Sequence, residues 1–111
     1  SSNRVLISIT NNNELFQQVR AGGASVASKT TSISDITDNF KVAIKYKEND
    51  FAFWINGVEI HTDTLGAAPI GLNRVGFDNG TDGVNTFDGK VKDVRVYKTA
   101  LSYEDLQYLT S

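Results

Sequence analysis

The chain has 111 residues, 40% hydrophobic and 22% charged, which is the composition of one ordinary globular domain with its own core. A net charge of −2 gives no electrostatic reason to expect nucleic acid or an anionic membrane as partner, and no apolar run approaches the ~20 residues that span a bilayer. The chain has no cysteine, no signal peptide and no methionine, even at position 1. We therefore expect a processed product or a piece of a longer protein.

The first third of the chain predicts three strands. Short runs of alternating or β-branched residues are separated by Asn11-Asn12-Asn13 and by Gly22-Gly23, which favour turns. In the first run, Val5, Ile7 and Ile9 would share one face. The predicted strands are 4–10, 14–20 and 25–31, followed by a loop or a single helical turn at 32–39.

The middle of the chain predicts an antiparallel meander of three strands, at 40–47, 51–55 and 58–61. Asn56-Gly57 indicates a type I′ turn, because that turn needs positive φ at both central residues. The register that puts the apolar side chains on one face pairs Tyr46 with Phe51, Ile44 with Phe53, Val42 with Ile55, Ile55 with Val58, Trp54 with Glu59 and Phe53 with Ile60. The opposite face then carries Ala43, Lys45, Ala52, Trp54, Glu59 and His61.

The last part of the chain predicts two more strands and a helix. Residues 62–72 are a crossing connection, and a strand at 73–78 and a turn-rich loop at 78–86 follow. The last strand, 90–97, changes the phase of its valines, which suggests a bulge near Lys92-Asp93. A short helix begins at Ser102, because Ser102 and Asp105 fit a capping box and Leu101 and Leu106 a hydrophobic staple. Leu106 and Leu109 would dock this helix on the sheets.

Eight or so short strands and one small helix predict an all-β protein. We expect a two-sheet antiparallel β-sandwich or jelly roll, formed by residues 1–111 as a single domain. A barrel is the structural alternative, because strand count alone does not separate the two.

The segment Phe-Asp-Gly-Lys-Val-Lys-Asp-Val-Arg-Val-Tyr-Lys-Thr-Ala-Leu-Ser (87–102), followed by Glu-Asp-Leu (104–106), resembles the closing signature of the concanavalin A-like lectin/glucanase superfamily, in its laminin-G-like branch. Residues 40–58, with a Lys-Val-Ala strand and a Trp-Ile-Asn-Gly hairpin, are similar to the central strands of that family. The overall style also resembles such domains in phage tail proteins and bacterial adhesins.

The resemblance implies a jelly roll of two curved sheets and, commonly, glycan binding. Such domains usually carry further strands before the point where this chain starts. We therefore expect an N-terminally truncated domain whose open edge pairs with the missing strands or with another chain, as in a homo-oligomer.

Trp54 is the leading candidate for a ligand-binding residue. It lies on the face opposite the predicted core, beside Lys45, Glu59 and His61. This arrangement suits a sugar, because pyranose C–H groups stack on an aromatic ring while the hydroxyls bind polar partners. The alternative is that Trp54 packs beneath a loop or helix as a second small core, since tryptophan is highly buried on average.

Calcium is the one cofactor that the sequence suggests, and otherwise we expect none. Oxygen-bearing side chains crowd the turn-rich loop, and calcium prefers ~6–8 oxygen ligands. The candidate ligands are Asp78, Asp82 and Asp88. The spacing matches no EF-hand, so the loop is a calcium site, a plain turn, or a surface where Asn79, Asp82 and Asn85 hydrogen-bond a sugar.

The other polar residues favour surface roles. His61 is the chain's single histidine, and without cysteines it cannot build a zinc site. Arg95 and Tyr97 either bind ligand or, in the case of Arg95, form a surface ion pair with Asp93. Solvated strand faces that discourage edge aggregation would carry Lys41, Lys45, Lys47, Lys90 and Lys92.

Enzyme chemistry is hard to build from this sequence. Glycoside hydrolysis needs two carboxylates about 5–9.5 Å apart, and the Glu-x-Asp-x-x-Glu motif of the family's hydrolases is absent. No catalytic triad and no glycine-rich phosphate loop is readable. We therefore expect no enzyme.

Two functions remain open. The first is a non-catalytic carbohydrate-binding or receptor-recognition module of a cell-surface or virion attachment protein, extracellular or on the virion, with a glycan or receptor as partner. The second is a structural or oligomerisation module of a phage tail or fibre protein that binds no sugar. Neither reading involves nucleic acid or membrane insertion.

Overall fold

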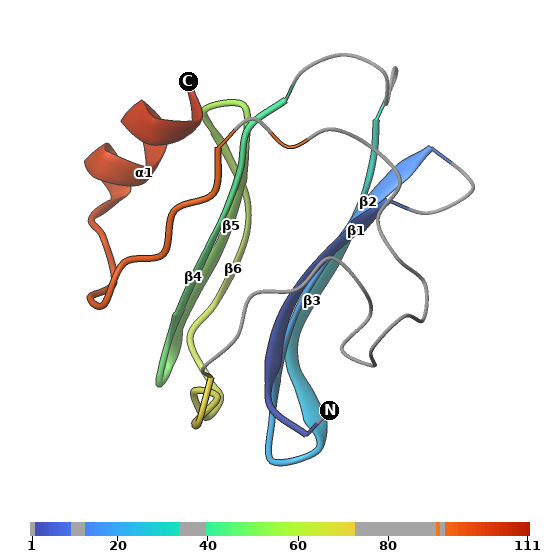
Figure 1. Ribbon diagram of the computed structural model, residues 1–111, viewed down its shortest axis with the longest axis vertical. Coiled ribbons are helices and arrows are strands. Elements are labelled where there is room, and N and C mark those ends of the chain that lie inside the picture. Colours follow the sequence, from blue (N-terminus) through green and yellow to red (C-terminus); the bar gives the residue numbers. More distant parts are fainter. Residues whose placement is uncertain (1, 10–12, 34–39, 73–90, 92) are drawn as a thin grey trace.

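The computed structural model describes residues 2–9, 13–33, 40–72, 91 and 93–111. Over these residues the chain forms two antiparallel three-stranded sheets, in the strand orders β1-β2-β3 and β4-β5-β6, and one helix. The elements are β1 (Arg4–Ile9), β2 (Glu14–Ala21), β3 (Ala24–Ser32), β4 (Val42–Lys47), β5 (Asp50–Ile55), β6 (Val58–Asp63) and α1 (Tyr103–Thr110). Figure 1 shows the two sheets face to face, with α1 on the outer side of the second sheet. The prediction of an all-β sandwich with a short C-terminal helix is confirmed.

The first strands of the first sheet follow the pattern that the sequence predicts. Val5, Ile7 and Ile9 of β1 lie opposite three fully buried residues of β2, namely Val19, Gln17 and Leu15. Val5 packs against the core, whereas Ile7 and Ile9 are 48% and 36% exposed. Between β2 and β3 the register shifts at Val19/Arg20, and this bulge leaves Val26 without a partner across the strands.

The second sheet follows the predicted register for most of its length. Val42, Ile44 and Tyr46 of β4 lie opposite Ile55, Phe53 and Phe51 of β5, as alternation requires. Asn56 and Gly57 have φ of 49° and 82°, the two positive values of a type I′ turn.

One pairing of the meander is wrong. Trp54 lies opposite Glu59 as predicted, but a bulge then shifts the register, so that Phe53 pairs with His61 and not with Ile60. Because an extra residue reverses the alternation of side chains beyond it, His61 lies on the inner face of the sheet. Its ring centroid is 5.5 Å from that of Phe53.

The main core fills the space between the sheets. Val19 and Ala27 of the first sheet pack with Phe51 and Phe53 of the second, and these four residues are at most 4% exposed. Around them pack Val5, Val26, Ile44, Tyr46 and Ile60. Burial of apolar surface stabilises this arrangement by roughly 25 cal/mol per Å².

A second, smaller core lies under α1, on the opposite face of β4-β5-β6. It contains Ala52, Trp54 and Leu106, with Ala43 and Leu101 packed against them. The helix begins where the sequence predicts, because the Ser102 hydroxyl accepts a hydrogen bond from Asp105 N at 3.2 Å. Leu101 and Leu106 share the cluster, as the predicted hydrophobic staple requires.

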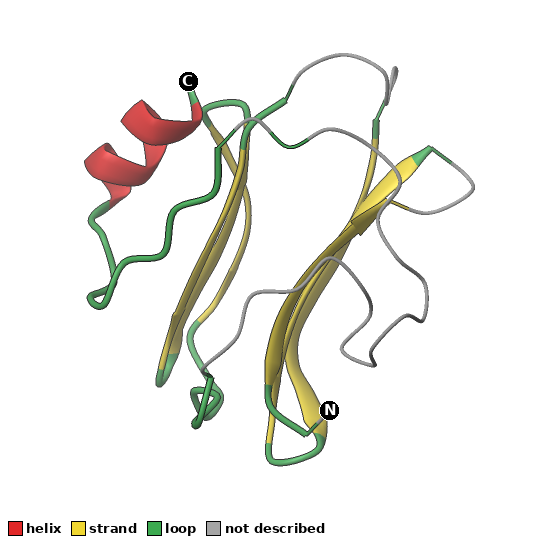
Figure 2. Ribbon diagram, in the orientation of Figure 1, coloured by secondary structure: helices red, strands yellow, loops and turns green. Residues whose placement is uncertain are grey.

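The last predicted strand is not formed. The described residues from Val91 to Tyr97 form no strand, and Figure 2 colours this segment as loop. Val91, Val94 and Val96 are 46%, 52% and 68% exposed, so these valines do not pack into a core as those of a paired strand would. A strand needs a ladder partner as well as a suitable composition, and no ladder joins this segment to either sheet within the described residues.

Some sequence predictions lie outside the described residues: residue 92 of the predicted bulge, the strand at 73–78, the loop at 78–86 and most of 32–39. The connection after β6 is described to residue 72 and holds neither strand nor helix beyond Asp63. It is tied to the β4–β5 turn, where Asn49 N donates to Gly66 O at 2.9 Å and Gly66 N donates to Asn49 Oδ1 at 3.1 Å. In the part of the chain that is described, no helix has the length and apolar character needed to cross a membrane.

Candidate ligand-binding site

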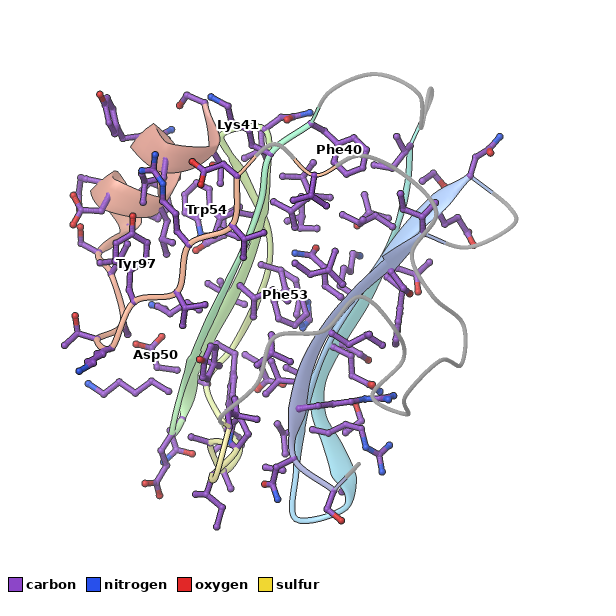
Figure 3. All side chains as sticks on the ribbon, in the orientation of Figure 1. Phe40, Lys41, Asp50, Phe53, Trp54 and Tyr97 are labelled. Carbon is purple, nitrogen blue, oxygen red and sulfur yellow. The ribbon has the colours of Figure 1, made fainter. Side chains whose placement is uncertain are left out.

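The outer face of the second sheet is the surface on which the sequence placed its ligand site. β4 and β5 present Ala43, Lys45, Ala52 and Trp54 to this side, because these residues alternate with the row that faces the core. Figure 3 shows Trp54 on the side of α1 and Phe53 between the two sheets. The prediction that these two neighbours point in opposite directions is confirmed.

Trp54 nevertheless offers no surface to a ligand. Its side chain is 0% exposed, and Tyr103 of α1 meets its ring edge-on with the centroids 4.7 Å apart. The structure therefore corresponds to the alternative that the sequence left open, a small core beneath a helix. A covered indole cannot stack on a sugar, so the predicted sugar platform at Trp54 is wrong. Its Nε1 is buried without a hydrogen-bond partner among the described residues.

The part of this face near the β4–β5 turn carries charged side chains. Lys45 Nζ forms an ion pair with Asp50 across the strands, with 2.8 Å between Nζ and Oδ1. In the ladder Asp50 lies opposite Lys47, but its carboxylate forms an ion pair with Lys45. Lys47 has no ion-pair partner among the described residues.

A shallow pocket of about 360 Å³ opens beside these residues. Its walls come from two parts of the chain that are far apart in sequence, the end of β4 and the segment that leads into α1. The lining residues are Tyr46, Lys47, Lys98, Thr99 and Ala100. Lys47, Lys98 and Thr99 carry polar side chains that can hydrogen-bond an oxygen-rich ligand, whereas the Tyr46 side chain packs against the main core.

The segment leading to the pocket holds a separate ion pair. Arg95 binds Asp93 Oδ2 through both Nε and Nη2, each at 3.0 Å. Hydrogen bonds to Tyr97 and Asp93, with the negative charge of Asp93, raise the pKa of Arg95 above its ordinary value. The predicted Asp93–Arg95 surface pair is confirmed. Tyr97 is 45% exposed, and Figure 3 shows it on the same outer side of the sheet as Asp50.

The structure brings together only some of the predicted ligand-binding residues. Lys45 and Glu59 lie on the outer face as expected, while Trp54 is buried and His61 turns to the inner face. Outside the described residues lie Asp78, Asn79, Asp82, Asn85 and Asp88. Within the described part, no group of three or more metal-binding side chains occurs, and the calcium site in the turn-rich loop stays a prediction.

The pocket is not predicted from the sequence. The sequence predicts Lys47 as one of the solvated strand lysines, and it gives Lys98 and Thr99 no role beyond the closing signature. Their proximity joins residues about fifty positions apart, so periodicity within either segment cannot reveal it. The one available signal was that polar residues follow directly on both predicted strands, where binding residues are commonly found.

Comparisons with known proteins identify the family to which this architecture belongs. A family model of the laminin-G type, described as Concanavalin A-like lectin/glucanases superfamily, matches residues 1–107. The crystal structure of an S-layer domain-containing protein (residues 221–444) from Clostridium thermocellum is similar to this chain, with a TM-score of 0.57 and 18% sequence identity. The alignment covers 100% of this chain and 58% of that one, and at this identity it shows the fold alone. No curated protein sequence matches the chain.

Proposed function

We propose that this chain, which belongs to the Concanavalin A-like lectin/glucanases superfamily, is a non-catalytic carbohydrate-binding module of a cell-surface or virion attachment protein. The pocket at the end of β4 is the observation that carries this proposal. Sugars present several hydroxyls, and binding them needs donors and acceptors that converge from more than one side. Lys47 supplies such a group from the end of β4, and Lys98 and Thr99 supply them from the segment before α1.

Two further observations support the proposal. The described residues that line the pocket include no carboxylate, whereas glycoside hydrolysis needs a pair of them flanking the bond, so binding without hydrolysis fits these residues better. The similar structure belongs to an S-layer domain-containing protein, and a surface layer is an extracellular setting. A module that recognises glycans or a receptor on another surface suits that setting.

A glycan array followed by isothermal titration calorimetry tests the proposal. We expect at least one saccharide to bind saturably and the variant Thr99→Ala, which removes a hydroxyl from the pocket, to weaken it about fivefold. Thr30→Ala removes the same groups from an exposed position on β3 and is the matched control. Absence of saturable binding across the array would argue against the function, and equal loss in both variants would argue against this pocket.

A second candidate is a structural or oligomerisation module. It is favoured by large apolar side chains that the described residues leave in solvent, with Leu65 76%, Val96 68% and Ile70 77% exposed. Contact with another subunit would remove such residues from water. Light scattering over a range of protein concentrations separates the candidates, because a chain that stays monomeric throughout does not self-assemble.

A further inference from the structure

We infer that the pocket at the end of β4 takes an anionic group, so that the saccharide bound there is an acidic one carrying a carboxylate or a sulfate. This inference rests on the proposed function and names its ligand class. It comes from the charges in the pocket and around it.

The cations near the pocket fall into two kinds. Lys45 and Arg95 are each neutralised within the protein, by Asp50 at 2.8 Å and by Asp93 at 3.0 Å. Lys47 and Lys98, the two that line the pocket, have no ion-pair partner among the described residues. The pocket is thus lined by two cations that no described carboxylate pairs with, in a chain whose net charge is −2.

Two ammonium groups around one small pocket repel each other in the absence of an anion. The repulsion is weak in water, because both side chains are exposed and solvent screens them. A carboxylate or sulfate between them removes the repulsion and accepts charge-assisted hydrogen bonds, which are shorter and stronger than neutral ones. The balance of charge therefore favours an anionic group over a neutral one in the same pocket.

The remaining pocket groups fit the rest of such a ligand. The hydroxyl of Thr99 can donate to an anion or exchange hydrogen bonds with sugar hydroxyls. Ala100 adds a small apolar surface, and Tyr97, 45% exposed, comes just before the pocket residues in the chain. Lys47 comes from the end of β4 and Lys98 from the segment before α1, so an anion between them would be held from two sides.

Binding of matched charged and neutral saccharides to the full chain tests the inference. An oligogalacturonate and its methyl ester share one backbone and differ in the carboxylate charge, and a sulfated galactan oligosaccharide and its unsulfated form test the sulfate. We expect one of the charged members to bind about tenfold more tightly than its neutral counterpart. This preference should disappear as ionic strength rises from about 0.01 M to about 1 M, where the Debye length falls from ~30 Å to ~3 Å.

Charge-removing variants locate the effect. Lys47→Gln and Lys98→Gln should each weaken binding of the charged saccharide about fivefold and reduce its preference over the neutral one, as expected for an exposed charge pair. Lys47→Arg should retain the preference because it keeps the charge. Lys29→Gln makes the same change at an exposed position on β3 and should bind as the parent does.

The outcomes separate this inference from the proposed function. Equal binding of charged and neutral members, still weakened by Thr99→Ala, would overturn the acidic ligand and leave a carbohydrate-binding pocket. A charge preference that Lys29→Gln reduces as much as Lys98→Gln does would overturn the assignment to this pocket. Failure of all four saccharides and of the wider array to bind would overturn both. Thermal unfolding of each variant confirms that it is folded.

Discussion

Replacing Leu106 by Ala should loosen α1 from the second sheet and expose Trp54. Leu106 is 6% exposed and packs in one cluster with Trp54 and Ala52. The substitution removes three carbon atoms, worth about 2.4 kcal/mol at about 0.8 kcal/mol for each buried methylene. Because a short surface helix can settle into part of the vacated space, we expect the free energy of unfolding to fall by about 2–3 kcal/mol, at the lower end for buried leucines.

The assay uses the chain's only tryptophan as the probe. Trp54 is 0% exposed in the parent, so its fluorescence should be poorly quenched by acrylamide. α1 has eight residues, too few to stay helical in water without its packing contacts. Leu106→Ala should therefore increase acrylamide quenching of Trp54 in native buffer, and the midpoint of urea denaturation should fall.

A matched control lies on the same helix. Tyr108 is 81% exposed, so Tyr108→Ala should change stability by less than about 0.5 kcal/mol and leave the quenching as in the parent. If Leu106→Ala kept the parent's midpoint and quenching, α1 would not be what covers Trp54, and the second core would be refuted. If Tyr108→Ala caused the same loss, the effect would come from the helix itself and not from its packing.

Three other substitutions test the fold at separate points. Ser102→Ala removes the hydroxyl that caps α1 and should cost about 1 kcal/mol by urea denaturation, whereas an unchanged midpoint would mean that the cap contributes nothing. Gly66→Ala should lower the free energy of unfolding by more than Gly22→Ala, which should lower it by about 1 kcal/mol. Both glycines have positive φ, but only a Cβ at Gly66 would come within 3.1 Å of Phe51. Equal losses would argue against that close approach. Gln17→Leu should change the free energy of unfolding by less than about 1 kcal/mol, because among the described residues the Gln17 side chain donates one hydrogen bond of 3.2 Å to β4 while its Oε1 is buried with no partner. A loss above about 2 kcal/mol would show that this bond holds the sheets together.

Where the governing interactions are local, the sequence predicted the structure. Alternation in β4 and β5 placed Ile44 opposite Phe53 and set Trp54 on the other face, because strand geometry sends successive side chains to opposite sides. The positive φ needed at Asn56 and Gly57, and the capping of α1 by Ser102, also depend on neighbours within a few positions. These features follow from the chain with no knowledge of its packing.

Only the tertiary structure decided what each face meets. Period-two alternation placed Trp54 away from the main core, but whether it meets solvent or a helix depends on α1, some fifty residues away. The bulge that turned His61 inward is a choice between neighbouring registers, which packing against Phe53 and its surroundings settles. The pocket between Lys47 and Lys98 likewise exists only once the two segments meet, because side-chain periodicity fixes direction along a strand and says nothing of what a distant segment will cover.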